Sequence, residues 1–517
     1  MNQVESLERE ALEILCLVRS VKNSFAPINR IPPEVLSLIP DHYGENGEAI
    51  ADRGFITLTH VCRGWRDIFT SCPSLWARFD FKNVDKTRTY IQRSQSSPLR
   101  IHIGYRYQRV VDEAFLLITP HIFRIKSLTI DADALPSELK HFRCNTPLLE
   151  KLDINIASGN PVLDGTLFNG DLSSLRELRL QGITTNLPWK NLANLQVVDL
   201  RYRVGEGYGV TQLLDFFESA PLLHTVTLQY SMLDTSDAPP ERIVPLHTRV
   251  FTIKAALTHL ALLLRHLYIP IGASLVLEFH SSDEGSLFPG YFPERSLNFG
   301  NLSDITVVNL LFSPYYRYAQ LNGPSGSLRV LARWGHWKVG LHSYTTDYQI
   351  LRTFSHSMLL AIQRLSISEY EHPRPPEVEE CPVSQTLSFT SNLRTLTLVN
   401  CNNQPFILAL DPPRSPSSPV LCPNMRQLVL YNSSLYQLDI QHLIDMARNR
   451  ASRGVKLSSI TISGQDGLAL EKERELLKLR EYVTHMEYRA HDLPPVWDHF
   501  PGGNCAEGEQ VREVVFR

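Results

Sequence analysis

Apolar residues along most of this chain recur in the spacing L-x-x-L-x-L, beginning near residue 120. The last two apolar positions of each copy are two residues apart, which predicts a β-strand with one buried face. The regular copies are Ile125/Leu128/Ile130, Leu149/Leu152/Ile154, Leu175/Leu178/Leu180, Leu195/Val198/Leu200, Leu223/Val226/Leu228, Ile362/Leu365/Ile367, Leu393/Leu396/Leu398, Met425/Leu428/Leu430 and Leu457/Ile460/Ile462. Irregular copies are expected at Leu257/Leu260/Leu262, Leu302/Ile305/Val307 and Val483/Met486/Tyr488.

Most copies start about 20 to 34 residues apart, which is the period of leucine-rich repeats. One such unit cannot bury its own apolar face, so stacked units share a core and align their strands in a parallel sheet. We therefore predict an α/β chain with an irregular leucine-rich-repeat solenoid over residues 121–490, a curved parallel sheet with helical or irregular return segments. Helical returns are predicted at 210–219, 348–361, 440–452 and 468–482. The repeat count and the structure of residues 231–345 stay open.

The first 26 residues carry a different, helical pattern. Their apolar residues alternate three and four apart, as at the a and d positions of a short coiled coil: Val4, Leu7, Ala11, Ile14, Val18, Val21 and Phe25. Three heptads are marginal for a dimer that stands alone. We expect this helix to pack its apolar stripe on the neighbouring domain, with dimerisation as the alternative.

Residues 27–80 read as a compact helical module, which we call the hook. Pro32 and Pro33 favour the first turn of a helix, where a missing N–H costs little, and Glu34 suits its N-terminus. A second helix is predicted from a stripe spaced three and four apart, which comprises Phe55, Leu58, Cys62, Trp65 and Phe69. Pro73 ends this helix, and Leu75 and Trp76 follow in a short apolar turn.

The hook resembles the F-box-like domain of fungal proteins in the segments IPPEVL, VCRGWRDI and PSLW. The flanking segments agree with that family, since PINRIPPE precedes the first helix and RSQSSPL, residues 93–99, follows Leu-Trp. The likeness covers about the first 105 residues. The long polar loop at 41–53 departs from the family pattern.

The resemblance implies that the hook binds a Skp-type adaptor of a cullin–RING ubiquitin ligase. It implies contacts from the first helix, the second helix and the Leu-Trp turn, namely Ile31, Pro32, Pro33, Glu34, Val35, Leu36, Ile39, Val61, Trp65, Leu75 and Trp76. Several of these residues must also hold the hook together, and Trp65 is expected to be core. Residues 81–120 are expected to form a connecting strand and helix segment, and residues 491–517 a tail or cap.

A target would bind the residues that alternate with the buried leucines, because these face out of the sheet. They are polar, rich in hydroxyl groups and carry charges of both signs. The candidates are Arg179, Arg201, Gln229, Arg364 and Tyr431, together with the aromatic residues Tyr316, Trp334 and Trp337. The aromatic residues could equally fill the core of irregular repeats.

Composition narrows the possible functions. The chain is 43% apolar and 20% charged with a net charge of −3, so it is globular and gives no reason to expect nucleic acid or an anionic membrane as partner. It has no secretory signal at its start and no apolar run long enough for a membrane span, and its eight cysteines form no C-x-x-C pair. We therefore expect a cytoplasmic or nuclear protein.

No catalytic, metal-binding or cofactor motif is present. The run Gly205-x-Gly207-x-Gly209 lacks the spacing of a dinucleotide site, and the histidines are not spaced as zinc ligands. We predict no enzyme and no cofactor, but a substrate-recognition subunit of a ubiquitin ligase with an unknown protein target. The alternatives are a non-ligase scaffold in which the hook only caps the solenoid, and an enzyme with its site in residues 231–345.

Overall fold

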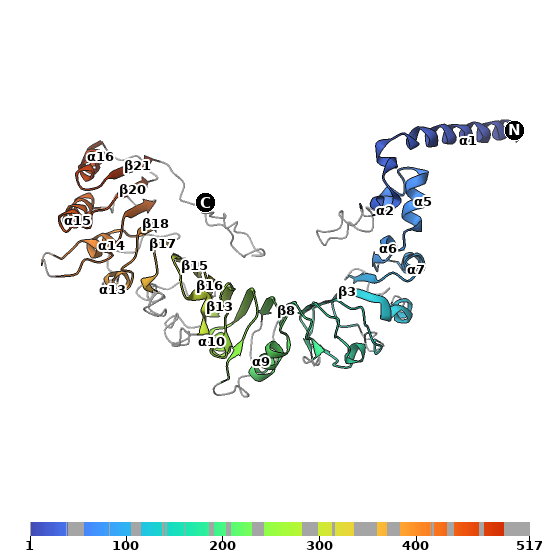
Figure 1. Ribbon diagram of the computed structural model, residues 1–517, viewed down its shortest axis with the longest axis horizontal. Coiled ribbons are helices and arrows are strands. Elements are labelled where there is room, and N and C mark those ends of the chain that lie inside the picture. The colour runs from blue at the N-terminus through green and yellow to red at the C-terminus, as the bar shows by residue number, and fades with distance from the viewer. Residues whose placement is uncertain are drawn as a thin grey trace. The chain divides into compact units, whose positions relative to one another are not determined.

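A computed structural model, drawn in Figure 1, describes most of the chain as an α/β protein with a long, mostly parallel sheet. It describes residues 2–39, 56–104, 115–202, 208–229, 242–281, 298–312, 316–334, 359–369, 383–431, 439–464 and 470–490, apart from positions 38, 82, 137–138, 140–141, 160, 186–190, 414 and 416–417. The chain divides into two compact units, residues 1–208 with 212–231, and residues 209–211 with 232–517. The predicted tail at 491–517 lies outside the described residues, as does most of the helical return predicted at 348–361.

The first unit begins with helices. They are α1 (Asn2–Ser24), η1 (Pro27–Arg30), α2 (Pro33–Leu36), α5 (Arg63–Ser71) and α6 (Pro73–Trp76). Leu36, Phe69 and Trp76 are buried in the core of the hook, and Trp65, as expected, is also buried. Prolines stand in the first turn of α2 and α6, where no N–H is needed.

The single helix predicted through Leu58, Cys62, Trp65 and Phe69 is interrupted. A short helical turn at 56–58 ends before residue 59, and α5 begins only at Arg63. Cys62 has an extended backbone with φ −157°, and the Arg66 side chain donates to the carbonyl of Thr59 across the break. The three-and-four spacing therefore describes the buried face of two short helical pieces.

Seven parallel strands of the first unit pair in chain order. They are β1 (Arg78–Asp80), β2 (Leu99–Ile103), β3 (Ile125–Ala132), β4 (Lys151–Ile156), β6 (Glu177–Gln181), β8 (Val197–Arg201) and β9 (Thr225–Gln229). The connections hold α7 (Val84–Arg93), η3 (Thr119–Arg124), η5 (Leu167–Gly170) and α9 (Val210–Ser219), and a small sheet of β5 (Val162–Leu163) with β7 (Thr184–Thr185). The sheet thus starts at β1, in residues that the sequence analysis assigned to the hook, and continues with β2 in the connecting segment.

The second unit holds ten strands of the long sheet among its described residues, in the spatial order β11, β13, β16, β15, β14, β17, β18, β19, β20, β21. Their bounds are β11 (Val250–Ala256), β13 (Ser274–Ser281), β14 (Val307–Phe312), β15 (Tyr316–Gly323), β16 (Gly326–Trp334), β17 (Arg364–Glu369), β18 (Thr395–Val399), β19 (Gln427–Tyr431), β20 (Ser459–Gly464) and β21 (His485–Ala490). A small sheet pairs β10 (Val244–Pro245) with β12 (Leu267–Tyr268). The helices are α10 (Leu257–Arg265), η8 (Gly300–Leu302), α13 (Val383–Ser388), α14 (Gln404–Leu410), α15 (Ile440–Ser452), α16 (Leu470–Leu477) and η10 (Lys478–Glu481).

All nine regular L-x-x-L-x-L copies place their last two apolar residues on a strand, as predicted, and these side chains are buried. The copies also share a turn. The N–H of the first apolar residue donates to the carbonyl three residues before it at Leu149, Leu175, Leu195, Leu393 and Met425. A polar side chain directly before that residue then bonds to the preceding repeat, as in Asn194 to the Ser173 carbonyl at 2.7 Å and Asn392 to the Leu360 carbonyl at 2.8 Å.

Two irregular copies were predicted wrongly. Leu257, Leu260 and Leu262 lie on helix α10, because leucines also recur at 263 and 264 and so satisfy the helical period; the strand of this segment is β11, just before it. In the other copy the frame is displaced by three residues. Ile305, Val308 and Leu310 are the buried set, and β14 starts at Val307.

The middle of the second unit departs from a run of parallel strands. β14, β15 and β16 are antiparallel neighbours, and β16 then pairs in parallel with β13. Gly323 pairs with Gly326 at the hairpin end, so the turn between β15 and β16 is tight. This hairpin is absent from the sequence prediction.

The apolar stripe of α1 does not pack on the hook, contrary to the expectation from sequence. Its side chains are exposed, from 52% at Val21 to 69% at Val4. The polar face of the helix is the one that lies toward the hook. Cys16, Arg19 and Asn23 line a hollow of about 420 Å³ together with Trp65 and other hook residues.

Candidate protein-binding surface

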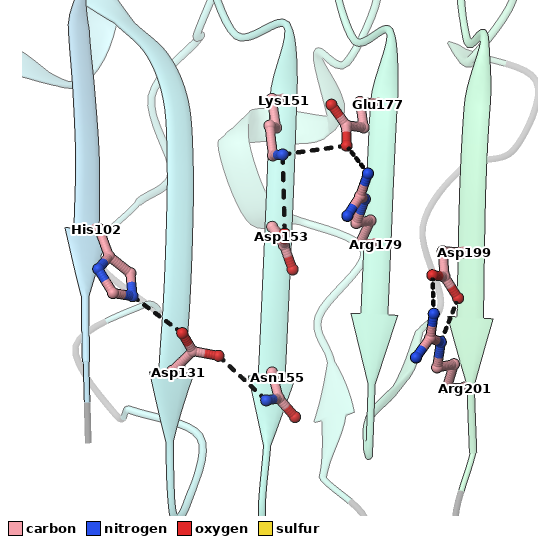
Figure 2. Close-up of polar contacts among 9 residues, drawn as sticks. All are labelled: His102, Asp131, Lys151, Asp153, Asn155, Glu177, Arg179, Asp199 and Arg201. Carbon is pink, nitrogen blue, oxygen red and sulfur yellow. Dashed lines mark hydrogen bonds and ion pairs between the residues drawn. The ribbon is translucent and has the colours of Figure 1, made fainter. Parts of the chain in front are cut away.

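Polar side chains, many of them charged, cover the outward face of the strands from β1 to β9. Along each strand the leucines and isoleucines point into the core, so the residues between them share the opposite face. The parallel registers set Asp80 beside His102, and Asp153, Arg179 and Asp199 in one row across β4, β6 and β8. Figure 2 shows nine residues of this polar face.

His102 lies between two carboxylates from neighbouring strands. Its Nδ1 is 3.2 Å from Asp80 Oδ1, and its Nε2 is 3.0 Å from Asp131 Oδ2. Asn155 Nδ2 donates to the other oxygen of Asp131 at 3.1 Å, so the chain of polar contacts runs from β1 to β4 (Figure 2 draws its His102–Asp131–Asn155 part). The hydrogen bonds to Asp131 and Asp80 raise the pKa of His102 to about 9, and the bond to His102 lowers the pKa of Asp131.

These contacts make His102 a cation near neutral pH. Both ring nitrogens face carboxylate oxygens, so a protonated ring donates to both of them. A histidine that acts as a general base needs one nitrogen free and a pKa near the working pH. The arrangement around His102 offers neither, and it fits a fixed positive charge on the sheet.

The next strands carry two further charge clusters. Lys151 Nζ donates to Glu177 Oε1 at 3.1 Å, and the Arg179 guanidinium contacts the same oxygen at 2.7 Å. Burial raises the pKa of Asp153, which lies 4.0 Å from Lys151 Nζ. On β8, Arg201 donates to both oxygens of Asp199 at 2.8 and 2.7 Å, and this bidentate contact raises the pKa of Arg201 (Figure 2).

The polar face therefore interleaves charges of both signs. Five acidic side chains (Asp80, Asp131, Asp153, Glu177 and Asp199) lie among four basic ones (His102, Lys151, Arg179 and Arg201). A polyanion binds a surface of one sign, whereas alternating charges select a complementary mixed surface, as between two proteins. Arg179 and Arg201 keep 47% of their side chains exposed and could contact such a partner.

The structure brings together only some of the predicted target residues. Arg201 on β8 pairs in register with Gln229 on β9, and Arg179 lies one strand earlier, so these three lie close together on one face. Arg364 is exposed at the start of β17 and Tyr431 half-buried at the end of β19. Tyr316 begins β15 and Trp334 ends β16, whereas Trp337 lies outside the described residues.

The predicted adaptor residues divide by exposure. Pro32, Pro33, Glu34, Val35 and Val61 are exposed, with Val35 at 50% and Val61 at 56%. Ile31 and Ile39 are half-buried. Leu36, Trp65, Leu75 and Trp76 are buried in the core of the first unit.

Sequence reasoning missed the His102 cluster. His102 falls at an outward position of the strand Leu99–Ile103, but its partners stand 22 and 29 residues away, so nothing local links them. The available signal was the recurrence of aspartate at outward positions of three predicted strands, at 131, 153 and 199. Over the described part of the chain, no group of three or more histidine, cysteine, aspartate or glutamate side chains is placed to hold a metal ion.

Two comparisons with known proteins found no relative of this chain. No protein-family model matches the chain, and a search of curated proteins found no match. Among the residues that the structure describes, no helix combines the length and apolar character needed to cross a membrane.

Proposed function

We propose that this protein is the substrate-recognition subunit of a cullin–RING ubiquitin ligase and is not itself an enzyme. The hook binds a Skp-type adaptor, and the outward face of the sheet binds a protein target. The sheet and its return segments then form a leucine-rich-repeat solenoid. The recurring turn, the polar side chain before it and the buried leucines support this finer description, because they repeat from one parallel strand to the next.

The observation that carries the adaptor proposal is the division of the hook residues by exposure. Leu36 and Trp65 close a small core, which leaves Pro32, Pro33, Val35 and Val61 on the surface. Apolar residues that stay exposed on a folded module are candidates for a protein interface. Their positions are those that the family resemblance assigns to the adaptor.

The polar face of β1–β9 supports the second half of the proposal. Its charges alternate in sign and are held in place by neighbouring strands, which favours recognition of a folded or extended protein segment. Arg179, Arg201 and Gln229 are the residues we assign to target contact on this face. This chemistry identifies the target as a protein surface of mixed charge.

Adaptor binding can be measured with the full chain and a purified Skp-type adaptor, by calorimetry or pull-down. The variant Val35→Asp/Val61→Asp should bind at least about tenfold more weakly, since a charge buried at an interface loses its hydration. Both side chains are exposed, so the hook should keep its fold, which circular dichroism would check.

A matched control places the same two charges elsewhere. Leu116 and Ile271 are 70% and 68% exposed and lie outside the hook, so Leu116→Asp/Ile271→Asp should bind the adaptor like the unmodified chain. Absence of binding by the folded, unmodified chain would refute the adaptor proposal.

Two ring contacts favour a second candidate, a scaffold protein in which the hook only caps the sheet. The Trp76 ring lies 5.1 Å from that of Tyr90 on α7, and Tyr90 lies 5.7 Å from Phe79 on β1. The end of the hook thus covers the first strand, as the cap of a repeat protein does. The same binding experiment separates the two, because a cap alone has no affinity for the adaptor.

A further inference from the structure

Helix α1 carries the largest continuous apolar stripe exposed in the described N-terminal part. Along its length Val4, Leu7, Ile14, Val18 and Val21 are each more than half exposed. Leu15 and Leu17, at the flanking e and g positions of the same heptads, are also exposed, at 43% and 68%. In proteins most helical stability comes from packing of the apolar face of a helix, so the stripe calls for a partner that covers it.

The hook does not supply that partner, because it contacts the other face of α1. Asn29 accepts a hydrogen bond from the Trp65 indole at 2.6 Å and donates one to the carbonyl of Asn23 at 2.6 Å. Asn29 therefore ties the last turn of α1 to the centre of the hook. With Cys16, Arg19 and Asn23 lining the hollow toward α5, the a and d positions are left free for a second molecule.

The charges along α1 indicate what that second molecule is. Its first half carries Glu5, Glu8, Glu10 and Glu13 with a single cation, Arg9, whereas its second half carries Arg19 and Lys22 and no acid. Two copies of the helix that run in opposite directions set each acidic half beside a basic half. A parallel pair would set the acidic halves together.

We propose that α1 pairs antiparallel with α1 of a second copy of this chain. One register sets Ala11 opposite Val21 and Ile14 opposite Val18, with Leu7 opposite Phe25 one residue beyond the end of the helix. Each of these layers joins an a position to a d position, and Val4 lies beyond the overlap. The e positions then bring Glu8 beside Lys22 of the second copy, twice by symmetry. Leu15 and Leu17 each meet their own counterpart, which covers the two flanking leucines that a strict a/d seam leaves exposed.

A parallel pair explains fewer of these residues. Its flanking contacts join Gln3 with Glu8, Glu10 with Leu15, and Leu17 with Lys22, and none of them is an ion pair. Leu12 lies at a b position, outside either seam. The antiparallel pair is therefore the arrangement that the charges and the leucines favour together, and it is independent of adaptor binding.

The test is the mass of the full chain in solution, measured by sedimentation or by light scattering from about 1 to 50 µM. We expect a dimer, and we expect that changes in α1 weaken or abolish it. Ile14→Asp, at the centre of the seam, should give a monomer. Its circular dichroism spectrum should differ from that of the wild type only by the helical signal of α1. A wild-type chain that is monomeric throughout this range would overturn the proposal.

Charge reversal tests the direction of pairing. Glu8→Lys and Lys22→Glu should each raise the dissociation constant on the order of tenfold, and the doubly changed chain should regain the wild-type value, because the ion pairs are restored across the dimer. The two positions are 14 residues apart on one helix, so rescue cannot arise within a chain. Glu13→Lys, at a c position away from the seam, is the control with the same charge change. A dimer unaffected by the single reversals would overturn the antiparallel arrangement.

Discussion

At the scale of single residues, one half-buried cation on the sheet face and one buried cation in the core of the second unit join distant segments. His102 is held on the sheet by carboxylates on both sides, and Arg450 lies inside the second unit with no exposed surface. Each is a charge whose partners come from distant sequence positions, so each ties separate repeats together.

The stability of the fold should fall with rising pH through the titration of His102. The pKa of the ring is about 9 in the folded protein, against an ordinary value of 6.5, so its protonated form stabilises the fold. That contribution is complete below pH 6.5 and is lost as the pH rises through about 9. Because the ring is 41% exposed, the effect should be about 1 kcal/mol or less.

The measurement compares urea unfolding of the wild type and His102→Gln from pH 6 to 10. The difference in the free energy of unfolding between the two proteins should be largest at pH 6 and vanish at high pH. His224→Gln is the control, since that ring bonds to the hydroxyl of Thr225 and not to a carboxylate. A difference that is constant with pH would contradict the assignment.

Replacing Arg450 should destabilise the second unit strongly. The guanidinium donates to the carbonyls of Leu421 at 2.9 Å, Cys422 at 2.8 Å and Leu410 at 3.3 Å, and so joins α15 to the end of α14 and to the following turn. Arg450→Met removes the guanidinium donor from all three buried carbonyls and leaves that of Cys422 with only the Met425 N–H, so it should cost about 2 to 4 kcal/mol. Arg426→Met, at an exposed position, should change the unfolding midpoint by little. Equal effects of the two would mean that the carbonyls find other donors.

At the scale of elements, the sequence predicted most strands and their mostly parallel pairing, but not the exceptions to that pairing. A copy such as Leu393/Leu396/Leu398 predicts its strand because alternate burial is a local property of the chain. The Leu257 copy failed because a run of leucines satisfies both periods. The β15–β16 hairpin was missed although Asn322, Gly323 and Gly326, between two apolar runs, are a local hairpin signal. The His102–Asp131 contact depends on the register between two strands, which the pattern within either one does not contain.

The β15–β16 hairpin depends on Gly326, which has a φ of +138°. A Cβ at this position would lie 2.4 Å from the carbonyl oxygen of Ala273 and 2.8 Å from the Cβ of Asn301, so the backbone would have to move. Gly326→Ala should therefore cost more than about 2 kcal/mol. Gly272, with a φ of +85° and open space around it, is the matched control, and Gly272→Ala should cost about 1 kcal/mol from its backbone conformation alone. Urea denaturation of both variants measures the difference, and similar losses would show that close packing at Gly326 contributes nothing.

At the scale of the whole molecule, most contacts join one strand to the next along the chain, so damage to one repeat should stay near that repeat. Leu178 on β6 and Leu428 on β19 are both fully buried and occupy equivalent positions of their copies. Each Leu→Ala change should cost about 2 to 5 kcal/mol locally. In a protein stabilised by interfaces between neighbouring repeats, the loss of stability affects adjacent repeats before distant ones.

Hydrogen exchange measured by mass spectrometry can follow the local loss of stability in each strand. Leu178→Ala should speed exchange in β4, β6 and β8 and leave β18–β20 close to wild type, and Leu428→Ala should do the reverse. The pair of variants is its own control, since the same side chain is truncated in both. Uniform acceleration in either variant would show that the strands unfold as a single cooperative unit, which would argue against a repeat architecture and in favour of one continuous core.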